Sequence, residues 1–281
     1  MIMLYFRGCT ARERINSISD STEKLLKLAK IDFKTLDNEE CCGSVLLRTG
    51  FEDEAKQQMK KNVANLKDEK IVVSCAGCYK TLKNDYNDLL GVELDIIHIS
   101  QLLHDLIEDN RLGSNKLDFN SLNFNSLNPS SLNPSSLNSN GLNSNEPSSI
   151  SASTSSKYEF VTYHDPCHLG RHMEEFDAPR EVIKSFSNLR EMENIRENSR
   201  CCGSGGGVKS AFPEIAKSIA IERGEEAENT GCNVLVTSCP FCKLNLDENS
   251  SLEVLDLSEF VLKRLVSENS NKNETEEDLD E

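Results

Sequence analysis

The sequence carries one cysteine pattern twice: a single cysteine, then an adjacent pair followed by glycine, then a Cys-x-x-Cys motif. Between the single cysteine and the pair lie 31 residues in one copy and 33 in the other, and 32 and 36 residues follow the pair. Core packing alone would not repeat this order at nearly equal intervals, so the pattern predicts two similar folding units. The two sets are Cys9, Cys41, Cys42, Cys75 and Cys78, and Cys167, Cys201, Cys202, Cys239 and Cys242.

Eleven cysteines are many for a chain of 281 residues with no evident secretory leader. The start, MIMLYFRGCT, is a short apolar segment without a basic beginning, so we expect an intracellular protein with reduced thiols. Free cysteines can be small buried apolar residues, and we expect this of Cys232, at the edge of a strand. The spacing of the other ten indicates metal or redox chemistry.

Strand-like and helix-like patterns alternate around the cysteines. Short apolar runs that predict buried strands end at four of them: Cys9, Cys75, Cys167 and Cys239. Helices are expected over four ranges: 12–30, 51–66, 178–186 and 213–230. This alternation predicts an α/β fold with two pseudo-symmetric Rossmann-like halves, each with a parallel sheet, whose cysteine loops face each other.

The composition changes between the halves. Asn, Ser and Pro dominate residues 115–156, and a leucine recurs at every fifth position from Leu117 to Leu142. So short a repeat offers too little apolar surface for a stacked core, and we interpret it as a flexible low-complexity linker. The predicted organisation is a first half over 1–114, this linker over 115–156, a second half over 157–266, and an acidic tail over 267–281.

A formal net charge of −16 excludes some classes of partner. Nucleic acids and anionic membranes repel a polyanion, and no apolar run reaches the length of a membrane-spanning helix. We therefore expect neither nucleic-acid binding nor a direct membrane span. The expected location is the cytoplasm, with membrane association only through a partner subunit.

The number of thiols limits the kind of metal site. Zinc takes four ligands and an ordinary cubane iron–sulfur cluster uses four cysteines, whereas each half offers five. Adjacent side chains diverge from one backbone, which suits an iron–sulfur core more open than a cube. Glycines after each pair allow the backbone to approach that core, with amides that can hydrogen-bond to sulfur.

The doubled pattern, with HDPCHLGRH at 164–172 and CCGSGGG at 201–207, resembles the cysteine-rich CCG-domain family of iron–sulfur oxidoreductases. It is most similar to the catalytic subunit of CoB–CoM heterodisulfide reductase, an enzyme of methanogenesis. The resemblance implies two non-cubane [4Fe–4S] clusters that split a mixed disulfide of two small thiols in single-electron steps. Carried over to this sequence, the first set of five cysteines would hold one cluster and the second set the other.

Histidines accompany the second set. His168 directly follows Cys167 and is a candidate proton donor to a leaving thiolate, because imidazole titrates near neutrality. A hydrogen bond that orders the loop is the alternative role, and Thr10 occupies the same place in the first half. His164 and His172 lie four residues to either side, but a proline and a glycine interrupt any helix there, so we expect no three-histidine metal site.

Three functions remain open at this stage. The first is an iron–sulfur oxidoreductase subunit that reduces a mixed disulfide of the CoB–S–S–CoM type. The second is an electron-relay subunit of a related lactate, glycolate, glycerol-3-phosphate or thiol:fumarate redox complex, and the third is a zinc-stabilised binding module. Because ferredoxin and flavin motifs are missing from the sequence, we expect an electron-donating iron–sulfur or flavin subunit as a partner, beside a small thiol or disulfide substrate.

Overall fold

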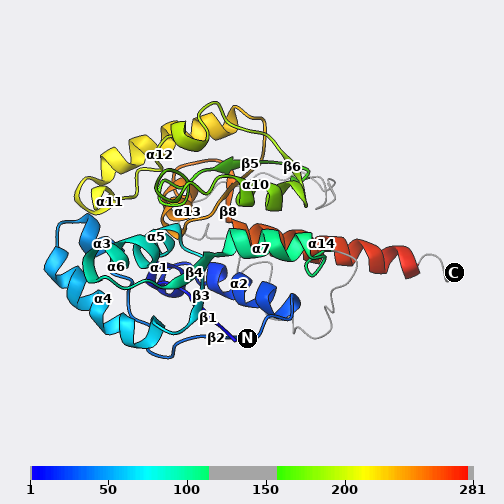
Figure 1. Cartoon of the computed structure of the whole chain (residues 1–281). Coiled ribbons are helices and arrows are strands. Elements are labelled where there is room, and N and C mark those ends of the chain that lie inside the picture. Colours follow the sequence, from blue (N-terminus) through cyan, green and yellow to red (C-terminus); the bar gives the residue numbers. More distant parts are fainter. Residues whose placement is uncertain (1, 114–156, 278–281) are drawn as a thin grey trace, which may run out of the picture.

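The computed structural model describes residues 2–113 and 157–277, and the predicted linker at 115–156 lies outside the described residues. The described chain contains two four-stranded sheets, one in each half, with helices beside them (Figure 1). In that view the first half, blue to green, lies below the second half, green to red. The predicted α/β fold with two Rossmann-like halves is confirmed.

The first half contains these elements in order: β1 (Met3–Phe6), α1 (Cys9–Glu13), α2 (Asn16–Leu28), β2 (Phe33–Lys34), α3 (Ser44–Arg48), α4 (Glu52–Leu66), β3 (Lys70–Val73), α5 (Ala76–Lys80), a π-helix (Thr81–Asp85), α6 (Tyr86–Leu90), β4 (Asp95–His98) and α7 (Ile99–Glu108). The second half contains β5 (Phe160–His164), α9 (Gly170–Met173), α10 (Asp177–Lys184), β6 (Asn188–Leu189), a 3₁₀-helix (Arg196–Asn198), α11 (Val208–Ala211), α12 (Pro213–Glu228), β7 (Val234–Thr237), α13 (Pro240–Asp247), β8 (Glu253–Asp256) and α14 (Leu257–Glu277).

The two sheets have the same topology. Their strand orders are β2-β1-β3-β4 and β6-β5-β7-β8, and all pairs are parallel. The central strands β1 and β7 are buried along their whole length, which explains their largely apolar sequences, since a parallel sheet is covered by helices on both faces. Every parallel connection needs a crossover, and the helices between the strands supply it.

The helix expected over 12–30 is in fact two helices. Helix α1 begins at Cys9, and α2 begins at Asn16. Between them, the backbone amides of Arg14 and Ile15 both donate to the carbonyl of Thr10, and Arg14 has left the helical conformation. The break allows the short helix that carries the first cysteine to take a direction of its own.

The last described helix passes the predicted boundary of the second half. Helix α14 continues from Leu257 to Glu277, through the first residues of the predicted acidic tail at 267–281. Residues 257–262 at its start are buried, and four of these six are apolar. The boundary at 266 therefore marks a change in composition rather than the end of an element.

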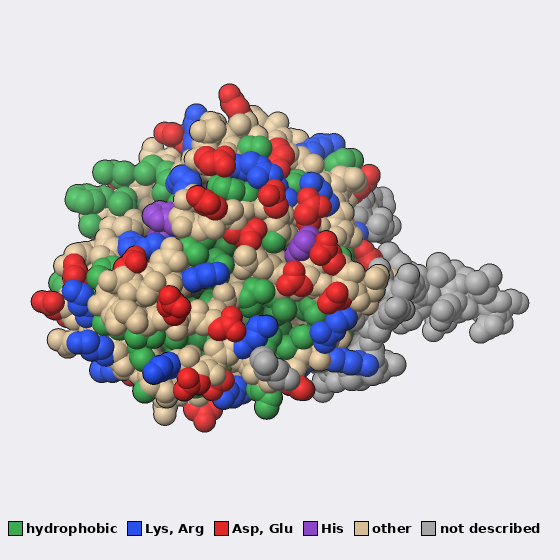
Figure 2. Space-filling view, viewed as in Figure 1, with side chains coloured by type: hydrophobic (Ala, Val, Ile, Leu, Met, Phe, Trp, Pro, Cys, Tyr) green, Lys and Arg blue, Asp and Glu red, His purple; other side chains and the backbone are tan. Residues whose placement is uncertain are grey.

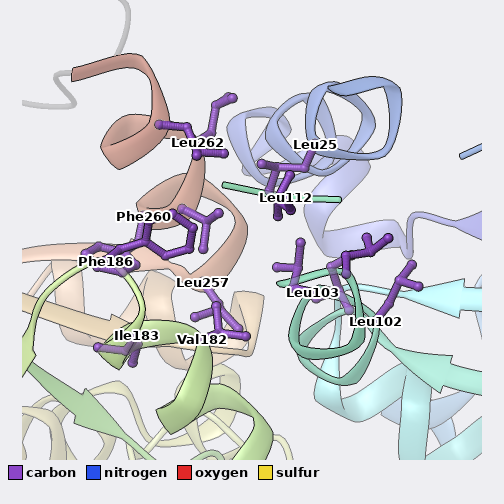
Figure 3. Packing of buried hydrophobic residues seen from close by; sticks show 14 of the residues in the cluster. Leu25, Leu102, Leu103, Leu112, Val182, Ile183, Phe186, Leu257, Phe260 and Leu262 are labelled. Carbon is purple, nitrogen blue, oxygen red and sulfur yellow. The ribbon is translucent and has the colours of Figure 1, made fainter. Parts of the chain in front are cut away.

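A shared hydrophobic core joins the two halves (Figure 3). Leu25 of α2 and Leu103 of α7 belong to the same buried cluster as Ile183 of α10 and Phe260 of α14. Helix α2 packs against α14, and α7 packs against α10. Because this apolar contact crosses between the sheets, it fixes the orientation in which their cysteine loops meet.

On the face that Figure 2 shows, charged side chains of one sign are not concentrated in one place. Acidic and basic side chains alternate there, with apolar side chains between them (Figure 2). None of the described helices is both long and apolar enough to cross a membrane.

Candidate metal centre

One cavity collects the cysteines of both halves. It has a volume of about 120 Å³ and lies where the loops after β1 and β3 meet those after β5 and β7. All eleven cysteines lie in the described part of the chain, and Cys232 is the one that does not line this cavity. The lining contains both predicted sets: Cys9, Cys41, Cys42, Cys75, Cys78, Cys167, Cys201, Cys202, Cys239 and Cys242.

In the first half the neighbouring cysteines of the pair contact different thiols. The Sγ atoms of Cys9 and Cys41 are 3.6 Å apart, and those of Cys42 and Cys78 are 3.3 Å apart. Both distances exceed the roughly 2.05 Å of a disulfide bond, and the cysteines of the described residues are free thiols. Cys41 and Cys42 also interact with each other, so the adjacent pair connects Cys9 and Cys78 within one group of thiols.

The two sets of thiols meet in the middle of the cavity. Cys75 and Cys239 are the N-cap residues of α5 and α13, and their thiols interact with each other across the two halves. This contact raises the pKa of Cys75, while hydrogen bonds with Cys242 and with Cys75 lower the pKa of Cys239. Ten thiols from two sheets thus form one group.

Burial and neighbouring thiols determine the charge of this group. Burial raises the pKa of Cys167 to about 11, and the hydrogen bond with Cys42 raises that of Cys41 to about 11. Hydrogen bonds from other thiols, first of all Cys201, lower the pKa of Cys202. Because thiolates are the metal ligands, a metal centre must displace protons from those thiols whose pKa is raised.

The glycine after each pair places a backbone amide against sulfur. The amides of Gly43 and Gly203 donate to the Sγ atoms of Cys41, at 3.5 Å, and Cys201, at 3.3 Å. Both glycines have a positive φ, 90° and 82°. At Gly203 a Cβ atom would also lie 2.5 Å from the carbonyl oxygen of Ala216, so no other residue fits there without movement of the backbone.

In each half, polar contacts tie the loop of the single cysteine to the loop of the pair. In the first half the carboxylate of Glu39 accepts hydrogen bonds from the amides of Arg7 and Gly8, both at 2.8 Å. In the second half the Ser199 hydroxyl donates to the carbonyl of Asp165 at 3.3 Å. Different residues therefore hold the same two loops together.

His168 lines the cavity beside Cys167 and is half-buried. Arg48, from the other half, donates from its Nε to His168 Nε2 at 3.4 Å and pairs with Asp85 at 2.7 Å. Burial lowers the pKa of His168, so the neutral ring, with its proton on Nδ1, matches this contact. The structure therefore places His168, the candidate proton donor, at the cavity. Its contact with Arg48 also orders the loop that carries it.

His164, the last residue of β5, is a part of the site that the sequence analysis did not identify. One of its ring nitrogens lies within 4.8 Å of the Sγ atoms of Cys202 and Cys242, and this is the one such group of potential metal ligands found among the described residues. The corresponding residue of the first half, also three positions before the single cysteine, is Phe6. The sequence did contain a signal for His164, because a histidine stands where the repeat predicts an apolar strand residue.

The sequence profile of the CCG family, described as a cysteine-rich domain, matches residues 3–83 and 161–247. These ranges cover more than half of the sequence and include all ten cysteines that line the cavity. The chain belongs to the CCG cysteine-rich domain family. The resemblance inferred from the doubled motif is therefore confirmed.

Relatives of this CCG chain are named as redox proteins. It is 35% identical over 263 residues to a subunit of dihydromethanophenazine:CoB–CoM heterodisulfide reductase from Methanosarcina acetivorans, a match that covers 89% of this chain and 55% of that protein. It is 30% identical over 252 residues to a subunit of fumarate reductase (CoM/CoB) from Methanothermobacter marburgensis, covering 89% and 42%. The chain spans about half the length of the heterodisulfide reductase relative.

Proposed function

We propose that this chain is an iron–sulfur oxidoreductase subunit that binds two clusters, one at each set of five cysteines. The observation that carries the proposal is the single cavity lined by all ten of these cysteines and not by Cys232. The names of the relatives, which are subunits of a heterodisulfide reductase and of a fumarate reductase, support the same class of chemistry.

The donor set fits non-cubane [4Fe–4S] clusters better than zinc. Five thiols in each half are one more than zinc or a cubane cluster takes. The paired Cys41 and Cys42 lie beside different thiols, which suits a core that both of them bind. The amides of Gly43 and Gly203 already donate to sulfur, and such hydrogen bonds help to set the potential of an iron–sulfur cluster.

The proposed substrate is a mixed disulfide of two small thiols. Its reduction, R–S–S–R′ + 2 e⁻ + 2 H⁺ → RSH + R′SH, consumes two electrons and two protons. When bound, the two clusters would supply the electrons one at a time. The contact between Cys75 and Cys239 supports a pair of adjacent electron sources that share one substrate site between the halves.

The chain's own residues would bind the substrate and deliver a proton. Val45 and Phe241 give the cavity an apolar wall for the carbon chains of the two thiols. In the neutral ring His168 Nε2 accepts from Arg48, whose guanidinium Asp85 fixes, so this contact orients the ring with its proton on Nδ1. To act as a general acid the ring would first take up a second proton at Nε2, in exchange for the contact with Arg48, and the imidazolium would then protonate a leaving thiolate from Nδ1.

An electron-donating partner completes this proposal. The sequence matches part of longer redox proteins, which supports an iron–sulfur or flavin subunit as the electron donor. The remaining expectations, a cytoplasmic location and membrane association only through that partner, belong to the same proposal.

Metal analysis and turnover of the full chain, purified without oxygen, test the proposal. We expect about eight iron and eight sulfide ions per chain, as two four-iron clusters require, and reduction of small mixed disulfides by a reduced viologen dye. Full clusters without disulfide reduction would favour the electron-relay function. A colourless chain with zinc and no sulfide would overturn the proposal in favour of a zinc-stabilised binding module.

A further inference from the structure

The two halves place different residues at the end of the strand that precedes the single cysteine. This residue is Phe6 in β1 and His164 in β5. Helices α4 and α12 differ in the same way, because their eleventh residues are Asn62 and Arg223. Both residues of the second half, but only Asn62 of the first, bring a polar side chain into the buried layer behind the cavity.

Arg223 determines which nitrogen of His164 carries the proton. It is fully buried, and its Nε donates to His164 Nδ1 at 3.1 Å. A guanidinium has donors only, so Nδ1 must present its lone pair and the proton of the neutral ring must lie on Nε2. The rest of the guanidinium is held by Glu226 at 2.6 Å, the carbonyl of Asn194 at 3.0 Å and the Ser199 hydroxyl at 3.2 Å.

The Nε2–H group of His164 then needs an acceptor, and the thiols beside the ring can provide one. The side chain is 1% exposed, and Nε2 lacks a hydrogen-bond partner among the described residues. Cys202 and Cys242 offer Sγ atoms in the same group. A role as a metal ligand would need a lone pair on Nε2, which the contact with Arg223 denies to the neutral ring.

We infer that His164 donates a hydrogen bond from Nε2 to sulfur at the second set of cysteines and so makes the second cluster easier to reduce than the first. This inference rests on the proposed function. Hydrogen bonds to the sulfurs tune the reduction potential of a cluster, because a donor stabilises the added negative charge. Phe6 provides no such donor, so electrons would settle at the second cluster, in the half that also carries His168.

The variant His164→Phe places the residue of the first half in the second. Redox titration of the full chain, followed by electron paramagnetic resonance, should show the potential of the second cluster shifted to a more negative value, toward that of the first. The first cluster, and the iron and sulfide contents, should not change. His164→Gln keeps an N–H donor at a similar distance from the backbone and should retain most of the wild-type potential, while Phe6→Leu should alter neither potential.

Two outcomes would overturn the inference: an unchanged potential in His164→Phe with both clusters complete, or loss of iron from the second site in both His164 variants, which would make the histidine a ligand. A wild-type chain without iron would contradict the proposed function instead. In that case NMR of the chain with nitrogen-labelled histidines still tests the inference, because it reports the tautomer of His164. The variant His164→Phe assigns the signal. An Nε2–H tautomer supports the donor, and an Nδ1–H tautomer excludes it.

Discussion

The two halves share a scaffold and differ in the polar residues behind it. Each has the same strand order, five cysteines at the same loops, and a glycine amide that donates to sulfur. The first half, however, has Phe6 and Thr10 where the second has His164 and His168. The duplicated backbone thus specifies where thiols lie, and the residues that do not repeat decide what each site can do.

The segment after the Cys-x-x-Cys motif also differs between the halves. In the second half it is the single helix α13, whereas in the first half a π-helical segment, Thr81–Asp85, follows α5. Asp85 at the end of this segment pairs with both Lys80 and Arg48. Because π-helical turns are frequent at functional sites, this insertion supports the role of Arg48 in orienting the histidine of the other half.

The largest expected effect comes from single replacements in the cysteine pairs. Cys202→Ser should remove the second cluster, with iron falling by about half, while the fold and the first cluster remain, because the proposed function uses all five thiols of each half as ligands. Cys42→Ser should remove the first cluster and leave the second in place. Iron and sulfide analysis with electron paramagnetic resonance measures both, and Cys232→Ser is the control. Full iron in all ten single variants of the cavity cysteines would contradict the assignment of these residues.

The next prediction compares how much one ion pair in each half contributes to the free energy of unfolding. Arg180 and Asp165 form an ion pair in the second half at 2.7 Å, with both side chains 2% exposed. Arg180→Met leaves the carboxylate buried without its partner and should lower the free energy of unfolding by about 3–5 kcal/mol. Lys34→Met, which breaks the exposed pair with Glu69 in the first half, should cost about 0–1 kcal/mol. Denaturant titration measures both, and equal losses would show that the buried pair has no special weight.

A smaller effect is expected for the residue that follows the single cysteine. His168→Ala should lower turnover roughly 10²-fold if the ring delivers a proton in the slow step, with both clusters assembled. Thr10→Ala, at the matching position of the first half, should leave turnover within about threefold of wild type. Steady-state rates with a mixed disulfide test this pair. An unchanged rate in His168→Ala would leave only the loop-ordering role.

The smallest effect is expected from the sequence between the halves. Deletion of residues 117–143, which lie outside the described residues, should leave cluster content and turnover intact, because repeated Asn, Ser and Pro bury little apolar surface. Iron analysis and a turnover assay are sufficient measurements. Loss of one cluster but not the other would show that this segment serves one half in particular.

The repeat in the sequence was enough to predict the parts of the site that depend on strand ends. Cysteines placed directly after buried strands must meet at one edge of a parallel sheet, which is why the single cysteine and the Cys-x-x-Cys motif of each half were expected to lie together. The repeat and the family resemblance assigned the adjacent pairs to the same two sets. The break between α1 and α2 could not be foreseen, because the pattern over 12–30 is continuous and the capping by the Thr10 carbonyl is a matter of local geometry.

The polar layer behind the cysteines was harder to predict. His164 belongs to the site through Arg223, 59 residues further along the chain, and sequence periodicity does not report contacts of that kind. A position-by-position comparison of the halves aligns Phe6 with His164 and would have drawn attention to the histidine. It would not have identified Arg223 as its partner. Glu39 and Asp165, which accept the hydrogen bonds between the loop of the single cysteine and the loop of the pair, were missed for the same reason. They hold the same two loops together in the two halves without occupying the same positions.

The shared core of α2 and α14 has a consequence for the order of events during synthesis. Domains fold as units while the chain emerges, yet the first half alone has only one wall of the cavity, with Cys75 lacking its contact to Cys239. The facing wall becomes fixed once α14 packs against α2, and α14 is the last described helix to leave the ribosome. The complete ten-thiol site therefore becomes available to an iron–sulfur assembly factor only after translation of the second half.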